Sequence, residues 1–351
     1  MSIATGIVYE TRVVSADKAG IAAAAELIRR GEVVGMPTET VYGLGADAWN
    51  EQAVEKIFLA KGRPADNPLI VHIADPEMLP LLTEDIPETA GQLMRAFWPG
   101  PMTLILKRKP CIPDIVTASL NTVGIRMPSN SAARALIRTS GRPIAAPSAN
   151  TSGKPSPTTA QHVYQDMRGK IPLILEGGSC RFGVESTVID ISDGKPVILR
   201  PGAVTAEMIE CAVKSVAVDP HVLSPIVGDS AVRSPGMKYR HYAPKARLTV
   251  YTGDEQSVIR MVCDQYDRAL GNGDKPVILG FDGRTYGNRR VFSLGDRDQP
   301  EIAANRLFSA LRRMDDEGIT VGFGEAVSLE GMGMAFMNRI GRAAEFRIIQ
   351  V

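Results

Sequence analysis

Several polar and partly cationic segments follow short apolar runs and could together bind an anion. Val33–Met36 and Pro143–Ala146 have the pattern of buried strands, and Pro37–Leu44 and Pro147–Ser156 follow them with hydroxyl, carboxylate, amide and lysine groups. Arg126 lies inside another apolar strand, and a buried arginine needs a carboxylate or phosphate partner, because unpaired burial is prohibitive. We therefore expect a concave anion-binding site on one sheet.

Other polar groups could belong to the same site. Val184–Thr187 and Leu199–Gly202 lie at two more predicted strand ends. Lys61–Pro68 follows a predicted helix, where the helix dipole alone could account for its cations. His72 lies in a predicted strand, and alternation would point it to the face opposite Val71. A lone histidine in a strand is more often a core residue than a ligand.

The sequence lacks the common motifs for phosphate binding and covalent catalysis. Gly153-Lys154 is followed by Pro155, which excludes a P-loop. The pairs at 43–45 and 331–333 lack the strand–GxGxxG–helix context of a dinucleotide site, so we predict turns there. No Ser/His/Asp or Cys/His arrangement is apparent, and the cysteines and histidines are too scattered for a metal cage.

The segment 234–245, SPGMKYRHYAPK, is the most unusual stretch of the chain. Its prolines and glycine disfavour regular helix or strand, and it holds three cations, two tyrosines and a histidine. A plain linker would have little aromatic content. This composition suits a segment that lies on an anionic, planar ligand such as a nucleotide. The alternative is a surface loop that happens to be basic.

Length and composition predict a globular protein of two domains. The chain has 351 residues, of which 44% are hydrophobic and 23% are charged. No apolar run approaches the roughly 20 residues that span a bilayer. The first residues lack the apolar core of a secretory signal, and the scattered cysteines suit reduced thiols in the cytoplasm. The net charge of +1 means that any anion site must be local.

The hydrophobic pattern predicts a mixed α/β domain followed by a smaller parallel α/β domain. Many strands of the first part are joined by loops, which favours a twisted mixed sheet. The expected elements there are helices at 52–60, 87–98 and 205–213 and strands at 33–36, 69–73, 103–106, 123–127, 143–146, 173–176, 186–191 and 197–200. After residue 246 the alternation is regular. The expected elements are strands at 248–251, 276–281 and 326–329 and helices at 255–270, 302–316 and 335–344.

The motifs of this chain resemble those of the YrdC/YciO family. Lys61-x-Arg63 paired with Ser148-x-Asn150 is similar to the family signature, and Pro37–Leu44 and Glu185–Thr187 reinforce the likeness. The segment 234–244 and the appended α/β domain are similar to the long, two-domain form. The resemblance implies a YrdC-like catalytic domain with a concave basic cavity at 14–208, a linker or lid at 209–246 and a Rossmann-like domain at 247–351.

The resemblance also implies an activity. It implies synthesis of threonylcarbamoyl-AMP and pyrophosphate from L-threonine, bicarbonate or CO2, and ATP, by a nucleotidyltransferase that uses Mg2+ with ATP. Other proteins would use the product for the t6A modification of tRNA. The implied protein is cytoplasmic, with no membrane association and at most weak binding of tRNA or double-stranded RNA.

Position by position, the resemblance assigns roles to individual residues. The implied threonine ligands are Thr40, His72, Arg126, Ser148 and Ser186. The implied nucleotide ligands are Arg63, Asn67, Thr122, Ala146, Ser156, Arg200 and Tyr242. Lys61 and Arg63 are the implied catalytic residues, Asn150 lines the same cavity, and the lid comprises Lys238, Arg240 and His241.

The implied chemistry agrees with the residues. A threonine carbamate would attack the α-phosphorus of ATP, so catalysis would consist mainly of charge neutralisation and alignment, and no covalent nucleophile is required. The carbamate and the mixed-anhydride product are unstable in water, so a closing segment would be useful. The alternative is a basic concave surface that binds double-stranded RNA or tRNA without chemistry. An RNA-binding surface gains nothing from a lid, so the linker distinguishes a synthase from an RNA-binding module.

Overall fold

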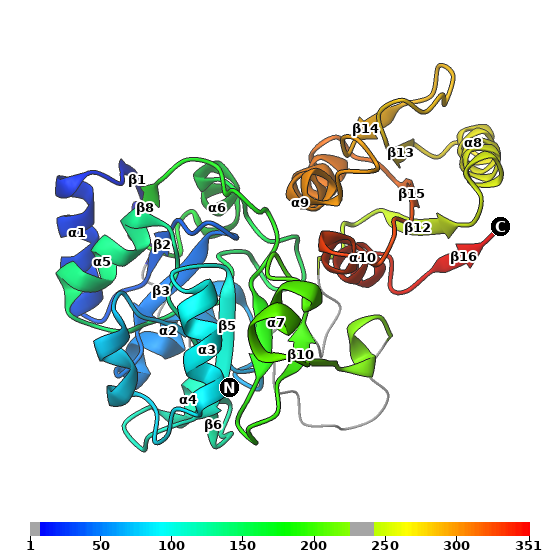
Figure 1. Ribbon diagram of the computed structural model, residues 1–351. Helices are drawn as coiled ribbons and strands as arrows, with labels where there is room; N and C mark the ends of the chain where they lie inside the picture. The colour runs from blue at the N-terminus through cyan, green and yellow to red at the C-terminus, as the bar shows by residue number, and fades with distance from the viewer. Residues whose placement is uncertain (1–7, 225–241) are drawn as a thin grey trace.

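The computed structural model describes residues 8–224 and 242–351. These residues form two α/β domains, one around an eleven-stranded sheet and the other around a five-stranded sheet (Figure 1). The expected fold, a twisted mixed sheet followed by a smaller Rossmann-like parallel domain, is therefore confirmed. The expected lid residues Lys238, Arg240 and His241 lie outside the described residues.

The sheet of the first domain is mixed. Its strands are β1 (Arg12–Ser15), β2 (Val34–Met36), β3 (Gly43–Asp47), β4 (Ile70–His72), β5 (Met102–Lys107), β6 (Thr122–Arg126), β7 (Ile144–Ala145), β8 (Leu173–Glu176), β9 (Thr187–Asp190), β10 (Val197–Arg200) and β11 (Ala217–Val218). They lie in the order β1-β8-β2-β3-β7-β4-β6-β5-β9-β10-β11. For example, β6 runs parallel to β4 on one side and antiparallel to β5 on the other.

Helices cover the two faces of this sheet unequally. On one face, α1 (Lys18–Arg29) and α5 (Ser131–Ser140) enclose a small core that contains none of the described side chains of β5 or β6. A larger core on the opposite face includes Val71, Leu104 and Ile125. The other helices of the domain are α2 (Glu51–Lys61), α3 (Glu88–Phe97), α4 (Asp114–Thr117), α6 (Ala160–Met167) and α7 (Ala206–Val213), with 3-10 turns at Pro76–Leu81 and Pro220–Val222. The alternate side chains of β4, β5 and β6 are thus left available for a site.

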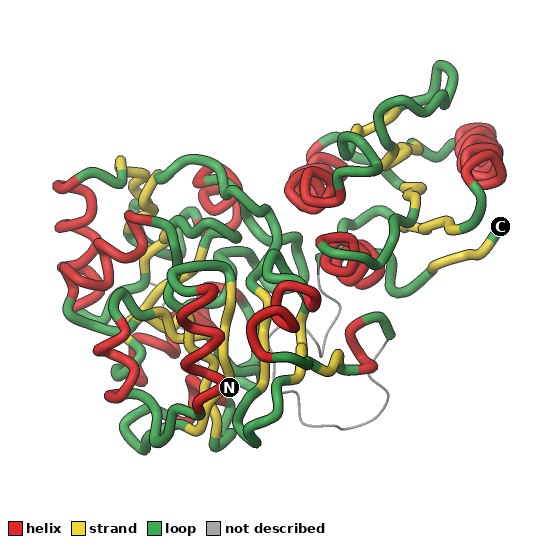
Figure 2. Tube along the Cα trace, in the orientation of Figure 1, coloured by secondary structure: helices red, strands yellow, loops and turns green. Residues whose placement is uncertain are grey.

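The C-terminal domain has a parallel sheet between two helical layers. Its elements are β12 (Arg247–Thr252), α8 (Glu255–Gly271), β13 (Pro276–Gly280), β14 (Val291–Ser293), α9 (Pro300–Asp316), β15 (Val321–Glu325), α10 (Met332–Ala343) and β16 (Ile348–Gln350). The strand order is β14-β13-β15-β12-β16, and every pair is parallel. α9 and α10 lie on the side that faces the first domain, and α8 lies on the far side (Figures 1 and 2).

Three local expectations were wrong, all at glycine-rich segments. The residues 331–333 are not a turn, because Gly331 caps α10 and the other two residues begin that helix. The residues 43–45 are not a turn but the start of β3, a central strand. A Cβ at Gly45 would lie 2.8 Å from the Ile144 side chain, so glycine permits close packing between strands there. The last strand before α10 is β15, whereas the sequence predicted a strand at 326–329. The prediction failed because Gly322 and Gly324 interrupt the apolar pattern of β15.

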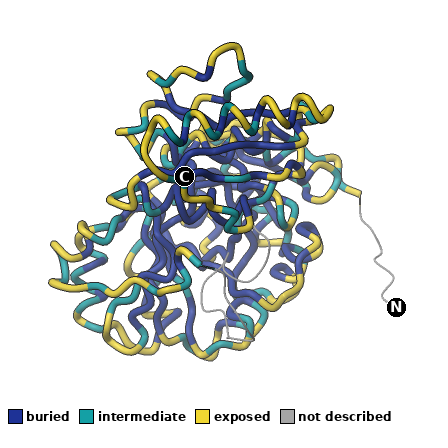
Figure 3. The backbone as a smooth tube through the Cα atoms, turned by 90° about the vertical axis from the view of Figure 1, so that its right-hand side faces the viewer, coloured by how far each residue is buried: buried dark blue, intermediate teal, exposed yellow. Residues whose placement is uncertain are grey.

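The buried residues form separate hydrophobic clusters on both faces of each sheet. In Figure 3 the buried segments run through the middle and the exposed ones form the outer loops and helix surfaces. The expected linker, 209–246, contains the second half of α7 and also β11, which pairs with β10. The first sheet therefore extends beyond residue 208. Among the helices of the described residues, none has the length and apolar character to cross a membrane.

Candidate active site

A row of polar side chains crosses β4, β6 and β5. His72 is the register partner of Arg126, and Arg126 is the register partner of Thr103. Successive side chains of a strand point to opposite faces, and Val71 and Ile125 belong to the larger core. The expectation that His72 faces away from Val71 is therefore confirmed. The row lies on the face that α1 and α5 leave uncovered beside β5 and β6.

This face forms the floor of an open cavity whose empty space, including the solvent at its mouth, is about 730 Å³. The cavity is lined by eleven of the candidate residues: Thr40, Lys61, Arg63, His72, Arg126, Ala146, Ser148, Asn150, Ser186, Arg200 and Tyr242. Glu185 is the one acidic residue among the described lining residues, against three arginines and one lysine. The cavity is thus basic, as expected, and low-dielectric walls strengthen its attraction for anions.

Arg126 has a protein carboxylate as its partner. Its Nη2 lies 2.7 Å from Oε1 of Glu39, and its Nη1 donates to Oγ1 of Thr40 at 2.8 Å. Glu39 also accepts hydrogen bonds from the backbone N–H groups of Ser129 and Asn130. Although burial opposes ionisation, Arg126 and these hydrogen bonds hold the pKa of the Glu39 carboxyl below its usual value. The sequence analysis included Glu39 in the segment Pro37–Leu44 but did not predict that it pairs with Arg126.

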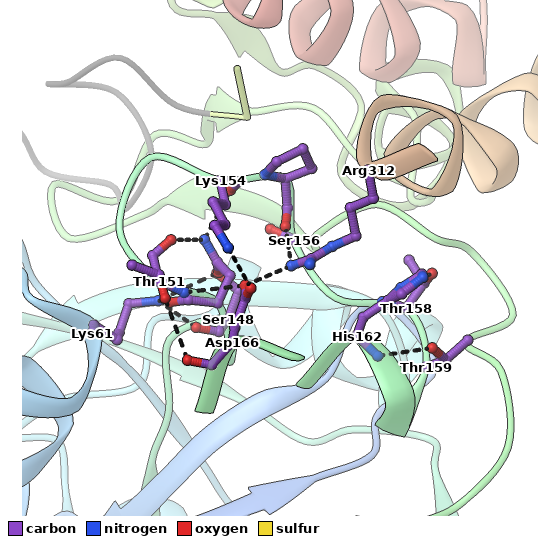
Figure 4. Close-up of polar contacts among 12 residues, drawn as sticks. Lys61, Ser148, Thr151, Lys154, Ser156, Thr158, Thr159, His162, Asp166 and Arg312 are labelled. Atoms are coloured by element: carbon purple, nitrogen blue, oxygen red, sulfur yellow. Dashed lines mark hydrogen bonds and ion pairs between the residues drawn. The ribbon is translucent and has the colours of Figure 1, made fainter. Parts of the chain in front are cut away.

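Lys61 connects the two halves of the family signature. It is the last residue of α2, which ends at Gly62 in the left-handed conformation. Its Nζ donates to the carbonyl oxygens of Ser148 at 2.5 Å and Asn150 at 2.7 Å (Figure 4). Burial, together with the charge of Arg63, lowers the pKa of the Lys61 amine well below its usual value. The amine thus holds the loop 147–150 in place as well as lining the cavity.

Arg200 holds the start of β9 beside the polar row. Its Nε donates to the carbonyl oxygen of Ser186 at 3.0 Å, and its Nη2 donates to Oγ of Ser186 at 3.1 Å. That hydroxyl is also 2.8 Å from Oγ1 of Thr103. Burial lowers the pKa of Arg200 to about 10, so the guanidinium remains charged at neutral pH. Arg200 and Ser186 therefore extend the basic wall of the cavity from the end of the row.

Three of the candidate nucleotide ligands are not among the lining residues. Thr122 begins β6, at the opposite end of the strand from Arg126, and the Ser156 hydroxyl donates to Glu185 at 2.5 Å. Asn67 is 0% exposed, yet neither polar atom of its amide has a hydrogen-bond partner among the described residues. A buried amide without partners is costly, so Asn67 is suited to a ligand. The ligand roles of these residues stay predictions.

Some lining residues received no role from the sequence. Thr38, Ser152, Gly153 and Glu185 line the cavity as well. Each lies within a polar run that the sequence singled out. The signal that could have found them is therefore their position between motif residues, because a loop that presents one side chain to a cavity usually presents its neighbours.

We expect His72 to stay neutral throughout the physiological pH range. Burial, and next the charge of Arg126, lowers its pKa to about 3. Its Nδ1 lies 3.3 Å from the Ile144 carbonyl, which can only accept, so Nδ1 carries the proton and Nε2 can accept from a ligand. NMR of ¹⁵N-histidine protein, assigned with His72→Gln, should show no titration of this ring between about pH 5 and 8. A midpoint near the ordinary value of about 6.5 would contradict this environment.

The fold and the cavity define a two-domain protein of the YrdC-like class. Comparison with known proteins identifies the family within this class. The family described as "Telomere recombination", of Sua5, YciO and YrdC proteins, matches residues 26–202. The family described as "Threonylcarbamoyl-AMP synthase, C-terminal domain" matches residues 204–345. The chain belongs to the threonylcarbamoyl-AMP synthase family.

Individual relatives match over nearly their whole length. The threonylcarbamoyl-AMP synthase of Pyrococcus abyssi is 50% identical over 328 residues, which are 93% of this chain and 95% of the relative. That of Bacillus subtilis is 48% identical over 94% of both chains. The crystal structure of P. abyssi Sua5 complexed with L-threonine has a TM-score of 0.92 at 46% identity and covers 98% of this chain and 99% of that one.

Proposed function

We propose that this protein is a nucleotidyltransferase that makes threonylcarbamoyl-AMP and pyrophosphate from L-threonine, bicarbonate or CO2, and ATP. The observation that carries the proposal is the basic cavity, which is lined by three arginines, one lysine and one carboxylate beside the polar row. The names of the full-length relatives and the threonine complex of the P. abyssi protein support the same substrates.

In the proposed reaction, the threonine amine adds to CO2 and loses a proton, which gives a carbamate. A carbamate oxygen then attacks the α-phosphorus of ATP, the bond to the β-phosphate oxygen breaks, and pyrophosphate leaves. Both reactants are anions, so the protein contributes alignment and charge neutralisation. Arg126 binds the threonine carboxylate through N–H groups left beside Glu39, since a guanidinium has five donors. The neutral His72 accepts a hydrogen bond from threonine.

The nucleotide lies along the cationic wall in this proposal. Arg63 and Arg200 bind phosphate oxygens as charged donors, and Arg63 also donates to the Asn67 carbonyl at 2.9 Å, which orders the loop after α2. The Asn67 amide supplies a donor and an acceptor that can be satisfied by the nucleotide. Tyr242 is 5% exposed and lines the same cavity.

We also propose that Mg2+ enters with ATP. Mg2+ commonly keeps several waters and is bound by substrate phosphates with one or two carboxylates. Among the described residues there is no group of three or more acidic, histidine or cysteine side chains placed for a metal, and Glu185 already binds Ser156 and Arg339. The lining therefore suits a cation held mainly by the phosphates, where it would neutralise their charge.

The wider setting of the reaction is a proposal too. The product is passed to proteins that complete the t6A modification of tRNA. We propose a cytoplasmic location, which agrees with four cysteines that form no disulfide.

Pyrophosphate release is expected to require threonine and bicarbonate together. With Mg2+ and ATP present, omission of either substrate should reduce release to background, because the carbamate is the nucleophile. A coupled pyrophosphate assay and mass spectrometry of the product would measure this. Equal release without threonine would contradict the synthase assignment. Tight binding of double-stranded RNA without pyrophosphate release would instead support an RNA-binding module.

A further inference from the structure

The C-terminal domain reaches the wall of the cavity through a buried arginine. Arg339, on α10, is 0% exposed, and its Nε donates to Oε2 of Glu185 at 2.8 Å. Its Nη2 also lies 3.4 Å from the Glu185 carbonyl oxygen. Glu185 is 154 positions away along the chain and belongs to the first domain. The contact therefore links the second domain to the residue just before Ser186.

Glu185 is an unusual residue for an anion site. It lines the cavity, and its other carboxylate oxygen accepts the hydrogen bond of the Ser156 hydroxyl. Burial opposes its ionisation, but the charges of Arg339 and Arg200 hold the pKa of its carboxyl below the usual value. Glu185 is thus a buried anion in the wall that would face a triphosphate. Without compensation it would repel the nucleotide and the carbamate.

Arg339 is placed to supply that compensation. Arg200, a second arginine near Glu185, also donates to the backbone and hydroxyl of Ser186. If Arg339 neutralises Glu185, the charge of Arg200 remains available for the phosphates. Arg339 also lies over the ring of Tyr242, with its guanidinium carbon 5.9 Å from the ring centroid. It therefore contacts two lining residues at once.

We propose that Arg339 is a positioning residue of the adenylation site, which the C-terminal domain contributes by neutralising Glu185 and fixing it behind Ser186. The inference rests on the proposed function and deepens it. The C-terminal domain then acts on the affinity of the first domain for its anionic substrates, and not only as a structural appendage.

A second arginine makes a similar contact at the neighbouring loop. Arg312, on α9, donates to the carbonyl oxygen of Pro155 at 2.6 Å and to Oδ2 of Asp166 at 2.8 Å (Figure 4). Lys154 binds the other oxygen of Asp166 at 2.9 Å. The chain a few residues after the loop that Lys61 holds is thus held by the second domain. The segments around Glu185 and Pro155 are therefore each bound by an arginine of the C-terminal domain.

The test is a charge-compensation experiment in the full chain. Arg339→Met removes the ion-pair partner of Glu185 and should raise the KM for ATP at least tenfold in the pyrophosphate assay, with a smaller change in kcat. Glu185→Gln/Arg339→Met removes both charges and should bring the KM back to within about threefold of the unchanged protein. Arg339→Lys keeps the charge and should also stay within about threefold. ATP binding by calorimetry should follow the same order.

A matched control separates this role from general docking of the domains. The Asn305 amide donates to the carbonyl oxygens of Cys180 and Arg181 across the same interface, and these residues are not among those that line the cavity. Asn305→Ala should therefore leave the KM for ATP unchanged.

Three outcomes would overturn the inference. They are an unchanged KM in Arg339→Met, a double variant as impaired as the single one, or an equal KM defect in Asn305→Ala. If Arg339→Met does not fold, a tenfold rise in the KM for ATP in the double or the lysine variant would overturn the inference, because neither buries an unpaired carboxylate. The unchanged protein is assayed first. Absence of threonine-dependent pyrophosphate release there contradicts the proposed function, whereas the ATP affinities of the variants still test the role of Arg339.

Discussion

Replacement of Arg126 by alanine is expected to weaken the binding of L-threonine by about 2–5 kcal/mol, because a buried, charge-assisted contact to the substrate carboxylate is lost. Each 1.4 kcal/mol is a factor of about ten in affinity, so the Kd should rise at least about 30-fold. ATP binding should change far less, since Arg63 and Arg200 are retained. Calorimetric titration with each substrate separately would measure both effects.

The contact between Arg126 and Glu39 complicates this variant and also provides its control. Loss of Arg126 leaves Glu39 buried without its cation, which typically destabilises a protein by about 3–5 kcal/mol. Glu39→Gln keeps one acceptor oxygen, for the N–H group of either Ser129 or Asn130, and removes the competing charge. It should preserve or strengthen threonine binding. Arg126→Lys keeps a charge but loses the forked geometry, so it should weaken threonine binding with a smaller loss of stability.

These two variants distinguish a ligand from a structural residue. If Arg126 serves only as the partner of Glu39, Arg126→Lys and Glu39→Gln should both lower the melting temperature and leave the threonine Kd unchanged. That pattern would show that the substrate carboxylate binds elsewhere in the cavity.

The sequence predicted elements well where hydrophobic periodicity and breakers agree. β8 and β10 have the predicted bounds, and α9 begins two residues before the predicted start. Periodicity failed where small residues carry the packing. α1 has an alanine-rich buried face, and β3 and β15 contain glycines at positions where a neighbouring strand or side chain lies close. A pattern based on large apolar side chains cannot detect such elements.

The candidate site, like the fold, was predictable only in part. Polar runs at strand ends predicted an anion cavity, and the register of β4, β6 and β5 brings His72, Arg126 and Thr103 side by side. The partner of each buried charge was not predictable. Glu39 is 87 positions before Arg126 in the chain, and Arg339 belongs to another domain, so both pairings depend on tertiary packing. Residue types indicate that a partner must exist, but not which one.

Replacement of Lys61 by methionine is expected to have the other large effect. Methionine fills a similar volume but cannot donate, so the carbonyl oxygens of Ser148 and Asn150 lose a charged donor. Hydrogen bonds to charged groups contribute about 1.5–3 kcal/mol each, so kcat/KM should fall by about 100-fold or more. Lys56→Met is the matched control, because Lys56 lies on the same helix and binds Gly31 and Glu32 away from the cavity. It should change kcat/KM less than about twofold.

The substrate dependence of the Lys61 variant reveals how the lysine acts. A lysine that only binds phosphate would affect the KM for ATP and leave the threonine Kd, measured without nucleotide, unchanged. A lysine that holds the loop of Ser148 and Asn150 should weaken threonine as well, because Ser148 is a candidate threonine ligand on that loop. We expect the second result, since both strong hydrogen bonds of Nζ are to the loop backbone. An unchanged threonine Kd in a folded Lys61→Met protein would assign Lys61 to the phosphates alone.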